Sequence, residues 1–329
     1  MSKDKVTEKD YYSVPKVSNT SIGWFQISPQ YFKKKLDKEL KDQDQKFFEL
    51  GRQVHMFILE RNEFNKLYTY LEFDTPKSKQ QIQFAEEVAG GKDIVDAYNS
   101  QYKATKNAEE KALELSTKLE RYIEYVKIRK DYKDVLSWSK WSTITGANKA
   151  VVAHKKANEL VYNDELFSTK DVETYNELPI FWNYPGYNLE CKSMLDRLVI
   201  DHKNKTIKLI DLKTTSHLHS FGKSIKAFKY DRQFAFYWMA IFYWWMKNHP
   251  DKNIDEYSEE TYVVGIQTRD LIEVKVFKIE DRLLNNGMVE IAETIPEIAW
   301  HFEENKWEYT KKYYQGDGIE TINMEDYNG

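Results

Sequence analysis

The chain has 329 residues, of which 41% are hydrophobic, enough for one large domain or two small ones with a substantial core. Its longest apolar run, Phe234 to Met246, is shorter than the roughly 20 residues that span a bilayer, so we expect no membrane partner. The single cysteine, Cys191, excludes a disulfide framework, a cysteine-based zinc site and a four-cysteine iron–sulfur cluster. The net charge of −4 excludes coating of nucleic acid by bulk charge.

The first half of the chain is predicted to be mainly helical. Its start shows no apolar segment typical of a signal peptide, and with one cysteine this predicts a cytoplasmic protein. Residues 1–15 are polar, so we expect a flexible N-terminus. Ser28-Pro29 then marks a helix start. Further helices are expected at 45–60, from Pro76 to Gly90, and over 148–161.

Between Asp93 and about Leu136, apolar residues recur at steps of three and four, which predicts one long inserted helix over 93–136. This helix either packs on its own domain or forms an arm that guides DNA or joins subunits. Both interpretations remain open.

From Leu178 onward the sequence becomes rich in β-formers. Three runs with strand character are followed by a helix that is apolar on every side, by two further strands, and by an amphipathic helix. These segments are ELPIFWNY, LECKSMLDRLVID and TIKLIDLKTT, residues 230–247, residues 261–279 and residues 280–305. The order predicts an α/β fold with its core over 171–310, a helical N-terminal cap over 16–170 that forms one compact unit with the core, and a polar C-terminal tail over 311–329.

Three charged residues lie inside two of the apolar strands. Asp196 is expected at the end of one strand, and Asp211 and Lys213 lie two residues apart on the next, so both project from the same face. Unpaired charge in an apolar setting is costly, and these residues therefore need a partner. Two carboxylates and a backbone carbonyl are oxygen ligands that suit Mg²⁺ or Mn²⁺.

The order of motifs resembles a known group of nucleases. Asp196, then Asp211-Leu212-Lys213, then Gln233 and Tyr237 at the start of a helix, resemble the PD-(D/E)XK nucleases of the RecB-like branch, which carry a Gln-x-x-x-Tyr motif. The earlier segment Gly51-x-x-x-His55-x-x-x-Leu59-Glu60 is similar to phage and prophage RecE-type exonucleases, which are exodeoxyribonuclease VIII-like. The resemblance spans about residues 17–309, and the segment 93–136 is an enlargement of the family pattern.

This resemblance implies a mixed central sheet flanked by helices and metal-assisted hydrolysis of phosphodiesters. Asp196, Asp211, the Leu212 carbonyl and His55 would bind Mg²⁺ or Mn²⁺, and Lys213 would orient the attacking water. His55 could instead be a core histidine, and Glu177 either an outer ligand or a solvated strand cap. Gln233 and Tyr237 would contact DNA phosphate or brace the strands. The chain has no P-loop motif, so no nucleotide cofactor is expected.

A basic segment accompanies this motif set. Residues 192–232 hold ten lysines and arginines against four aspartates, and several of these cations lead into the helix that carries Gln233. A plausible track for DNA phosphate consists of Lys192, Arg197, Lys223, Lys226, Lys229 and Arg232. The alternative is a basic helix face that is merely solvated.

The sequence therefore predicts a metal-dependent deoxyribonuclease. By resemblance it is an exonuclease that resects double-stranded DNA ends in the 5′-to-3′ direction, in phage-type recombination or repair in the host cytoplasm. The resemblance also implies a single-strand annealing protein as partner and a ring-shaped homo-oligomer. Two alternatives stay open: a structure-specific or nicking DNA endonuclease on the same core, and a DNA-end-binding module that no longer cleaves.

Overall fold

The computed structural model describes residues 8–40, 45–73, 76–103, 106–130, 134–162 and 171–322. The chain forms two compact units: residues 1–51 together with 150–329, and residues 52–149. This division differs from the expected cap over 16–170, because helices α2 (Asn19–Ile27) and α3 (Pro29–Leu36) belong to the unit that contains the sheet. Helix α1 (Glu8–Ser13), which precedes the expected cap, also belongs to this unit.

The first unit is built on a five-stranded mixed sheet. Its strands lie in the order β3 (Val172–Asn183), β4 (Glu190–Asp201), β5 (Thr206–Thr215), β6 (Ser258–Gln267) and β7 (Glu273–Lys278). Neighbouring strands are antiparallel except β5 and β6, which are parallel. A parallel pair needs a long connection, and here the connection contains the 3₁₀ turn η1 (Leu218–Ser220), α13 (Phe221–Ala227), α14 (Tyr230–Asn248) and the turn η2 (Ile254–Glu256). The predicted α/β fold with helices flanking a mixed sheet is confirmed.

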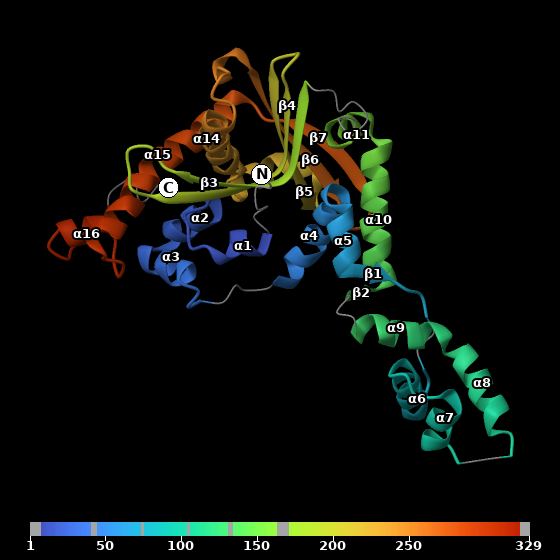
Figure 1. Cartoon of the computed structure of the whole chain (residues 1–329). Coiled ribbons are helices and arrows are strands. Elements are labelled where there is room, and N and C mark those ends of the chain that lie inside the picture. Colours follow the sequence, from blue (N-terminus) through green and yellow to red (C-terminus); the bar gives the residue numbers. More distant parts are fainter. Residues whose placement is uncertain are drawn as a thin grey trace. The chain divides into compact units, whose positions relative to one another are not determined.

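Helix α14 packs on β3 and β4, and α15 (Asp281–Glu304) packs in turn on α14 (Figure 1). The two helices approach closely because residue 287 is glycine: a Cβ there would lie 2.4 Å from the carbonyl oxygen of Asp231. The predicted burial of α14 on every side is wrong for its second half, where Phe242 is 53% and Met246 is 60% exposed.

Both ends of the first unit contain more structure than the sequence predicted. Residues 8–13 form α1, and Val17 forms a parallel bridge with Cys191 of β4, so the described part of the N-terminus is held on the sheet. Residues 1–7 lie outside the described part. At the other end, α16 (Lys311–Gln315) starts the expected polar tail and is tied to α15 by an ion pair between Lys311 and Glu297. Helix α11 (Lys155–Val161) completes this unit.

The second unit contains short helices and one small sheet. Its elements are α5 (Arg61–Leu67), β1 (Tyr68–Tyr70), α6 (Lys79–Ala89), α7 (Ile94–Gln101), α8 (Ala108–Lys118), α9 (Glu120–Lys130) and β2 (Asp134–Leu136), with β1 and β2 parallel. Two helices cross the boundary between the units: α4 (Gln45–Leu59) and α10 (Trp138–Ala153).

The predicted single helix over 93–136 is wrong. Tyr102 ends α7 in an extended conformation, and Leu119 separates α8 from α9. The apolar residues at helical spacing instead form a local core with α6, in which Phe84, Ala97 and Leu119 are buried. Because α7, α8 and α9 are separate helices, their apolar residues can be buried within one unit. A single straight helix could bury them only against another partner. Among the described residues, no helix has both the length and the apolarity needed to cross a membrane.

Candidate active site

The candidate active site lies where β4 and β5 separate. Asp196 is in the middle of β4, and the expectation that it ends the strand is wrong. The last paired residues of the β4–β5 ladder are Arg197 and Ile210, so Asp196 and Asp211 are the first residues beyond the pairing. Beyond this point β5 remains paired with β6. The two carboxylates therefore stand at a fork between strands, one on each branch.

Backbone and side-chain donors hold both carboxylates. The Leu212 N–H donates to Asp196 Oδ2 at 2.7 Å, and thus bonds to a side chain of β4 in place of its backbone. Gln233 Nε2 donates to Asp211 Oδ1 at 2.8 Å. Lys213 Nζ lies 2.9 Å from Asp211 Oδ2. The expected association of Asp196, Asp211, Lys213 and Gln233 is therefore present, although their roles in a reaction stay predictions.

Burial and charge act together on these groups. Only 1% of the Asp211 side chain is exposed. Burial raises the pKa of Asp196, and Lys213 and the Leu212 N–H offset only part of this effect. Burial alone would lower the pKa of Lys213, but Asp211, Asp196 and Tyr230 outweigh it and the pKa is raised. Lys213 is thus held as a cation.

Glu177 stands opposite Asp196 on the neighbouring strand. The β3–β4 ladder pairs Asn176 with Arg197 and Leu178 with Leu195, and it skips the two residues in between. Glu177 has a left-handed backbone (φ 47°), a conformation that costs about 1–3 kcal/mol and concentrates at functional sites. A carboxylate oxygen of Glu177 and one of Asp196 lie within 4.8 Å of each other. This position favours the ligand interpretation over the strand-cap interpretation.

The donor set of the first unit fits a divalent cation. Asp211 and Asp196 both lie near Lys213, and Glu177 lies near Asp196, so in the described contacts of the fork the carboxylates outnumber this cation. Mg²⁺ and Mn²⁺ bind oxygen ligands that together carry an excess of negative charge. Leu212 lies on β5 between Asp211 and Lys213, and the role of its carbonyl as a ligand stays a prediction.

Two aromatic residues of α14 face the same place. Tyr237 lies one helical turn after Gln233, and burial together with the nearby Asp211 raises its pKa well above the ordinary value, so its hydroxyl keeps its proton and remains a donor. The ring of Tyr230 lies 4.9 Å from Lys213 Nζ. The sequence analysis missed Tyr230, although its position three residues before Gln233 on the same helix was a usable signal.

His55 lies on the part of α4 that belongs to the second unit, and its role as a ligand stays a prediction. Gly51, four residues earlier, belongs to the first unit. A Cβ at Gly51 would lie 2.7 Å from Thr214 Oγ1 of β5, so only glycine allows α4 to approach this strand.

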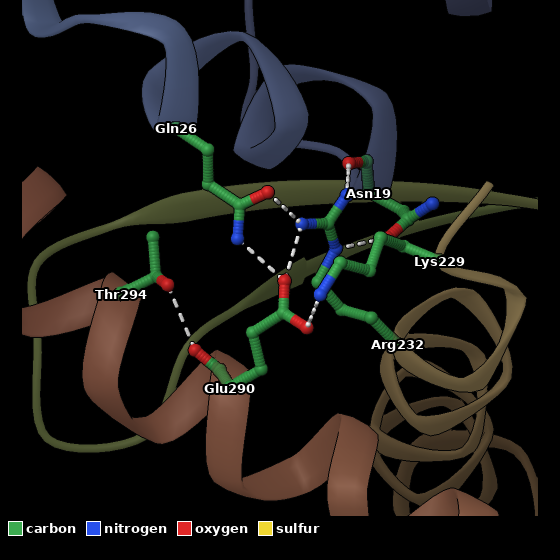
Figure 2. A network of polar contacts seen from close by, with 6 residues as sticks. All are labelled: Asn19, Gln26, Lys229, Arg232, Glu290 and Thr294. Carbon is green, nitrogen blue, oxygen red and sulfur yellow. Dashed lines mark hydrogen bonds and ion pairs between the residues drawn. The ribbon is translucent and has the colours of Figure 1, made fainter. Parts of the chain in front are cut away.

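Two of the expected phosphate contacts are buried structural residues. Arg197 is fully buried and donates to the carbonyl of Leu160 and to Asn176 Oδ1. Arg232 is also buried and points to Asn19 and Gln26 of α2 and to Glu290 of α15 (Figure 2). Its guanidinium donates to Asn19 Oδ1, Gln26 Oε1 and Glu290 Oε1 at 2.7–2.9 Å. Because their donors are committed inside the fold, the prediction that these arginines contact DNA is wrong.

The four lysines of the set differ in exposure. Lys192 donates to the carbonyls of Tyr11 and Val14, which fastens the N-terminal segment to β4. Lys229 lies 3.1 Å from Glu290 Oε2 and belongs to the Arg232 network (Figure 2). Lys223 and Lys226 are exposed on one face of α13. The predicted phosphate track is therefore limited to the exposed Lys223, Lys226 and Lys229, for which it stays a prediction.

A family model described as "PDDEXK-like domain of unknown function (DUF3799)" matches residues 18–310. The chain belongs to this family. The match covers both units and supports the PD-(D/E)XK part of the predicted resemblance, and with the residues at the fork it supports a nuclease. The RecE-type part stays a prediction. The comparison with curated proteins found no match.

Two solved structures are similar at low identity. A protein from Eubacterium rectale named "Putative exonuclease" is 12% identical, with 88% of this chain and 99% of that chain covered and a TM-score of 0.35. A protein named SSO0001 is 13% identical, with 75% of this chain and 85% of that chain covered and a TM-score of 0.25. At these TM-scores neither similarity bears on the activity of this chain.

Proposed function

We propose that this protein is a divalent-metal-dependent deoxyribonuclease that degrades double-stranded DNA from its ends. The observation that carries the proposal is the fork of β4 and β5, where Asp196 and Asp211 meet beside an ion-paired Lys213. A site that only bound DNA would have no use for buried carboxylates, because they repel phosphate and are costly to desolvate.

The proposed metal ligands are Asp196, Asp211, the Leu212 carbonyl and His55, with Glu177 as a further ligand. Bound there, Mg²⁺ or Mn²⁺ would supply Lewis acidity and lower the pKa of a bound water. The chain itself fixes the carboxylates: the Leu212 N–H holds Asp196, and Gln233 holds Asp211. Such preorganised donors avoid the cost of orienting the ligands during the reaction.

Lys213 acts in this proposal as a fixed positive charge. Asp211, Asp196 and Tyr230 raise its pKa, which favours the ammonium form over a neutral amine that could act as a general base. Its ammonium group instead orients the attacking water and offsets the negative charge that grows on the phosphate in the transition state. Tyr237 can donate its hydroxyl proton in a hydrogen bond, either to a phosphate oxygen or to the carboxylates.

The dependence on DNA ends, the 5′-to-3′ polarity, a single-strand annealing partner and a ring-shaped oligomer are proposed from the resemblance to RecE-type exonucleases. Encircling the duplex would keep such an enzyme on its substrate between successive cleavages. The exposed Lys223 and Lys226 of α13 supply the proposed contact with DNA phosphate.

The experiment compares linear and closed DNA. Duplexes labelled at the 5′ or 3′ end and a covalently closed plasmid are incubated with the protein in Mg²⁺, Mn²⁺ or EDTA, with Asp211→Asn as the matched inactive control. We expect loss of linear duplex in Mg²⁺ or Mn²⁺ only, and early release of the 5′ label as single nucleotides or short products. Nicking of closed plasmid at a comparable rate would establish the endonuclease instead, and binding of ends without cleavage would establish the binding module.

A further inference from the structure

A second cluster of potential metal ligands lies elsewhere on the first unit. Glu173 is the second residue of β3, His202 follows the last residue of β4, and His249 caps the end of α14. One ligand atom from each lies within 4.8 Å of the others. Nε2 of His202 is 2.8 Å from Glu173 Oε1, and Nε2 of His249 is 3.6 Å from Glu173 Oε2.

This cluster is distinct from the candidate active site. Glu173 precedes Glu177 by four residues on β3, which corresponds to roughly 13 Å along a strand. His202 follows Asp196 by six residues, roughly 20 Å along β4. The fork lies in the middle of these strands, whereas the cluster sits at one end of them, where β4 and β5 are joined by a turn. The cluster therefore has no part in the chemistry proposed at the fork.

We propose that Glu173, His202 and His249 form a zinc site. Two imidazole nitrogens and a carboxylate oxygen are a ligand set of zinc, which binds them at about 2.0–2.2 Å in tetrahedral geometry, so that ligand atoms lie about 3.3 Å apart. The two histidines lie 2.8 and 3.6 Å from the two oxygens of the Glu173 carboxylate, one from Oε1 and the other from Oε2, which is near this value. Mg²⁺ prefers oxygen ligands and is a poor occupant of such a site.

His249 gives the second, independent observation. Its side chain is 9% exposed, and its Nε2 makes no hydrogen bond among the described residues, with the Glu173 oxygen lying beyond hydrogen-bond length. A buried imidazole nitrogen without a hydrogen bond is costly. A metal ion between His249, His202 and Glu173 would satisfy this atom with a small adjustment of side chains.

The surroundings hold the ligands in place. Nδ1 of His202 is 2.8 Å from the hydroxyl of Tyr257, which leaves Nε2 directed at Glu173. Tyr175 donates its hydroxyl proton to Glu173 Oε2. Such outer partners fix the orientation of zinc ligands in general. The backbone of each histidine is also held, His202 by the carbonyl of Asp171 and His249 by that of Trp245.

Lys252 competes for the same place. Its ammonium group lies 3.1 Å from Nε2 and 3.3 Å from Nδ1 of His202. Lys252 is exposed, so it can swing into solvent when a metal binds. This competition separates the proposal from its alternative, a polar cluster in which lysine is the cation, because only a metal site gains affinity when Lys252 is removed.

The proposed ion would join three elements at this end of the sheet: the start of β3, the turn between β4 and β5, and the end of α14. Its role is structural, since binding to the folded state stabilises that state by mass action. Helix α14 carries Gln233 at its other end, so a firmly anchored α14 also supports the candidate active site.

The test uses the full chain with Asp211→Asn, so that metal at the fork contributes little. The protein is stripped with EDTA, transferred to buffer and titrated with ZnCl₂ or MgCl₂ while thermal unfolding is followed. We expect zinc at about one hundred times its Kd to raise Tm by roughly 5 °C, and magnesium to leave Tm unchanged. Replacement by Co²⁺ should give the visible absorption of a four-coordinate cobalt site.

Four variants in the same background decide the assignment. His249→Ala and the nearly isosteric Glu173→Gln should abolish the zinc shift, and Lys252→Met should lower the Kd for zinc several-fold. His219→Ala is the matched control, since His219 also lies 3.6 Å from a glutamate, Glu273, but is 78% exposed. If His249→Ala does not fold, Glu173→Gln alone decides. An equal zinc response with and without Glu173→Gln, or no response at all, overturns the proposal.

Discussion

Two neighbouring residues of α14, Arg232 and Gln233, belong to two polar clusters that differ in their balance of charge. Arg232 points to α2 and α15, where its guanidinium meets Asn19, Gln26 and Glu290 (Figure 2). Gln233 points to the sheet, where it donates to Asp211. In the first site Arg232 and Lys229 share one carboxylate, that of Glu290, and the other donors of Arg232 find neutral acceptors. In the second site several carboxylates share one lysine.

This difference distinguishes charged residues that stabilise the fold from charged residues that serve the proposed reaction. A buried ion pair whose donors are all satisfied needs nothing further and can be lost only at a cost in stability. A cluster with excess negative charge destabilises the fold unless a cation joins it. Removing charge should therefore have opposite effects on stability at the two sites, and activity should depend on only one of them.

The largest effect is expected for the carboxylates at the fork. Asp211→Asn, and separately Asp196→Asn, should lower the rate of DNA cleavage by at least the roughly 10²–10³-fold seen when one electrostatic stabiliser is removed. In EDTA their Tm should be unchanged or higher, since repulsion between carboxylates is relieved. Initial rates in Mg²⁺ and thermal unfolding in EDTA measure both. Cleavage near the wild-type rate in either variant contradicts the assignment.

Arg232→Met should have the opposite effect: it should lower stability and largely preserve the cleavage rate. It removes the guanidinium partner of the partly buried Glu290, which keeps its ion pair with Lys229, and should lower the free energy of unfolding by roughly 1.5–3 kcal/mol. The cleavage rate per folded molecule should change much less. Denaturant unfolding measures the loss, and the double variant Arg232→Met with Glu290→Met is the control, because removing both charges should recover part of it. A stable Arg232→Met protein that binds DNA weakly would instead return Arg232 to the phosphate track.

The sequence predicted those parts of the molecule that local pattern determines. Alternating apolar residues gave β4 and β5, and the two-residue spacing placed Asp211 and Lys213 on one face. Partners that are distant along the chain could not be predicted. Arg197 was taken for a DNA contact because its acceptor on Leu160 lies in another element. Glu290, 58 residues after Arg232, was equally invisible.

The break of the expected long helix has a similar cause. The spacing of apolar residues between Asp93 and Leu136 fits one helix or three, because the residues at Tyr102 and Leu119 where the chain turns are neither glycine nor proline. Only packing against α6 selects the folded-back arrangement. The left-handed backbone of Glu177 also has no local signal, since glycine usually occupies this conformation.

Gln233→Ala tests whether positioning of Asp211 matters apart from its charge. A hydrogen bond to a charged group contributes roughly 1.5–3 kcal/mol, so kcat should fall about tenfold or more while KM changes little. Steady-state kinetics on linear duplex measures both constants. Gln233→Glu is an informative companion: it keeps the size but places a carboxyl beside Asp211, and should raise the pH at which activity appears. A rise in KM alone would instead make Gln233 a DNA contact.

The exposed lysines of α13 should affect binding more than chemistry. Lys223→Glu with Lys226→Glu should raise KM for linear duplex several-fold, and lower the salt dependence of binding by about one contact per lysine removed. Lys247→Glu, an exposed charge reversal at the far end of α14, is the matched control and should behave as wild type. Binding measured at several salt concentrations decides, and equal slopes for all proteins would remove α13 from the DNA interface.

The smallest effect is expected at Lys192. This lysine extends the comparison because it donates to two backbone carbonyls, those of Tyr11 and Val14. Burial lowers its pKa from 10.5 to about 8, whereas the carboxylates beside Lys213 raise the pKa of that lysine. Between pH 8 and 10.5 the unfolded chain therefore binds more protons at this position than the folded one, and stability contributed by Lys192 rises with pH. The Tm of wild type should gain on the order of 2 °C relative to Lys192→Met across this window.

Lys16→Met, which removes a neighbouring lysine paired with Glu190, is the control and should show no such gain. A constant difference between wild type and Lys192→Met would mean that Lys192 keeps its charge in the folded protein, and its place among the DNA contacts would be open again.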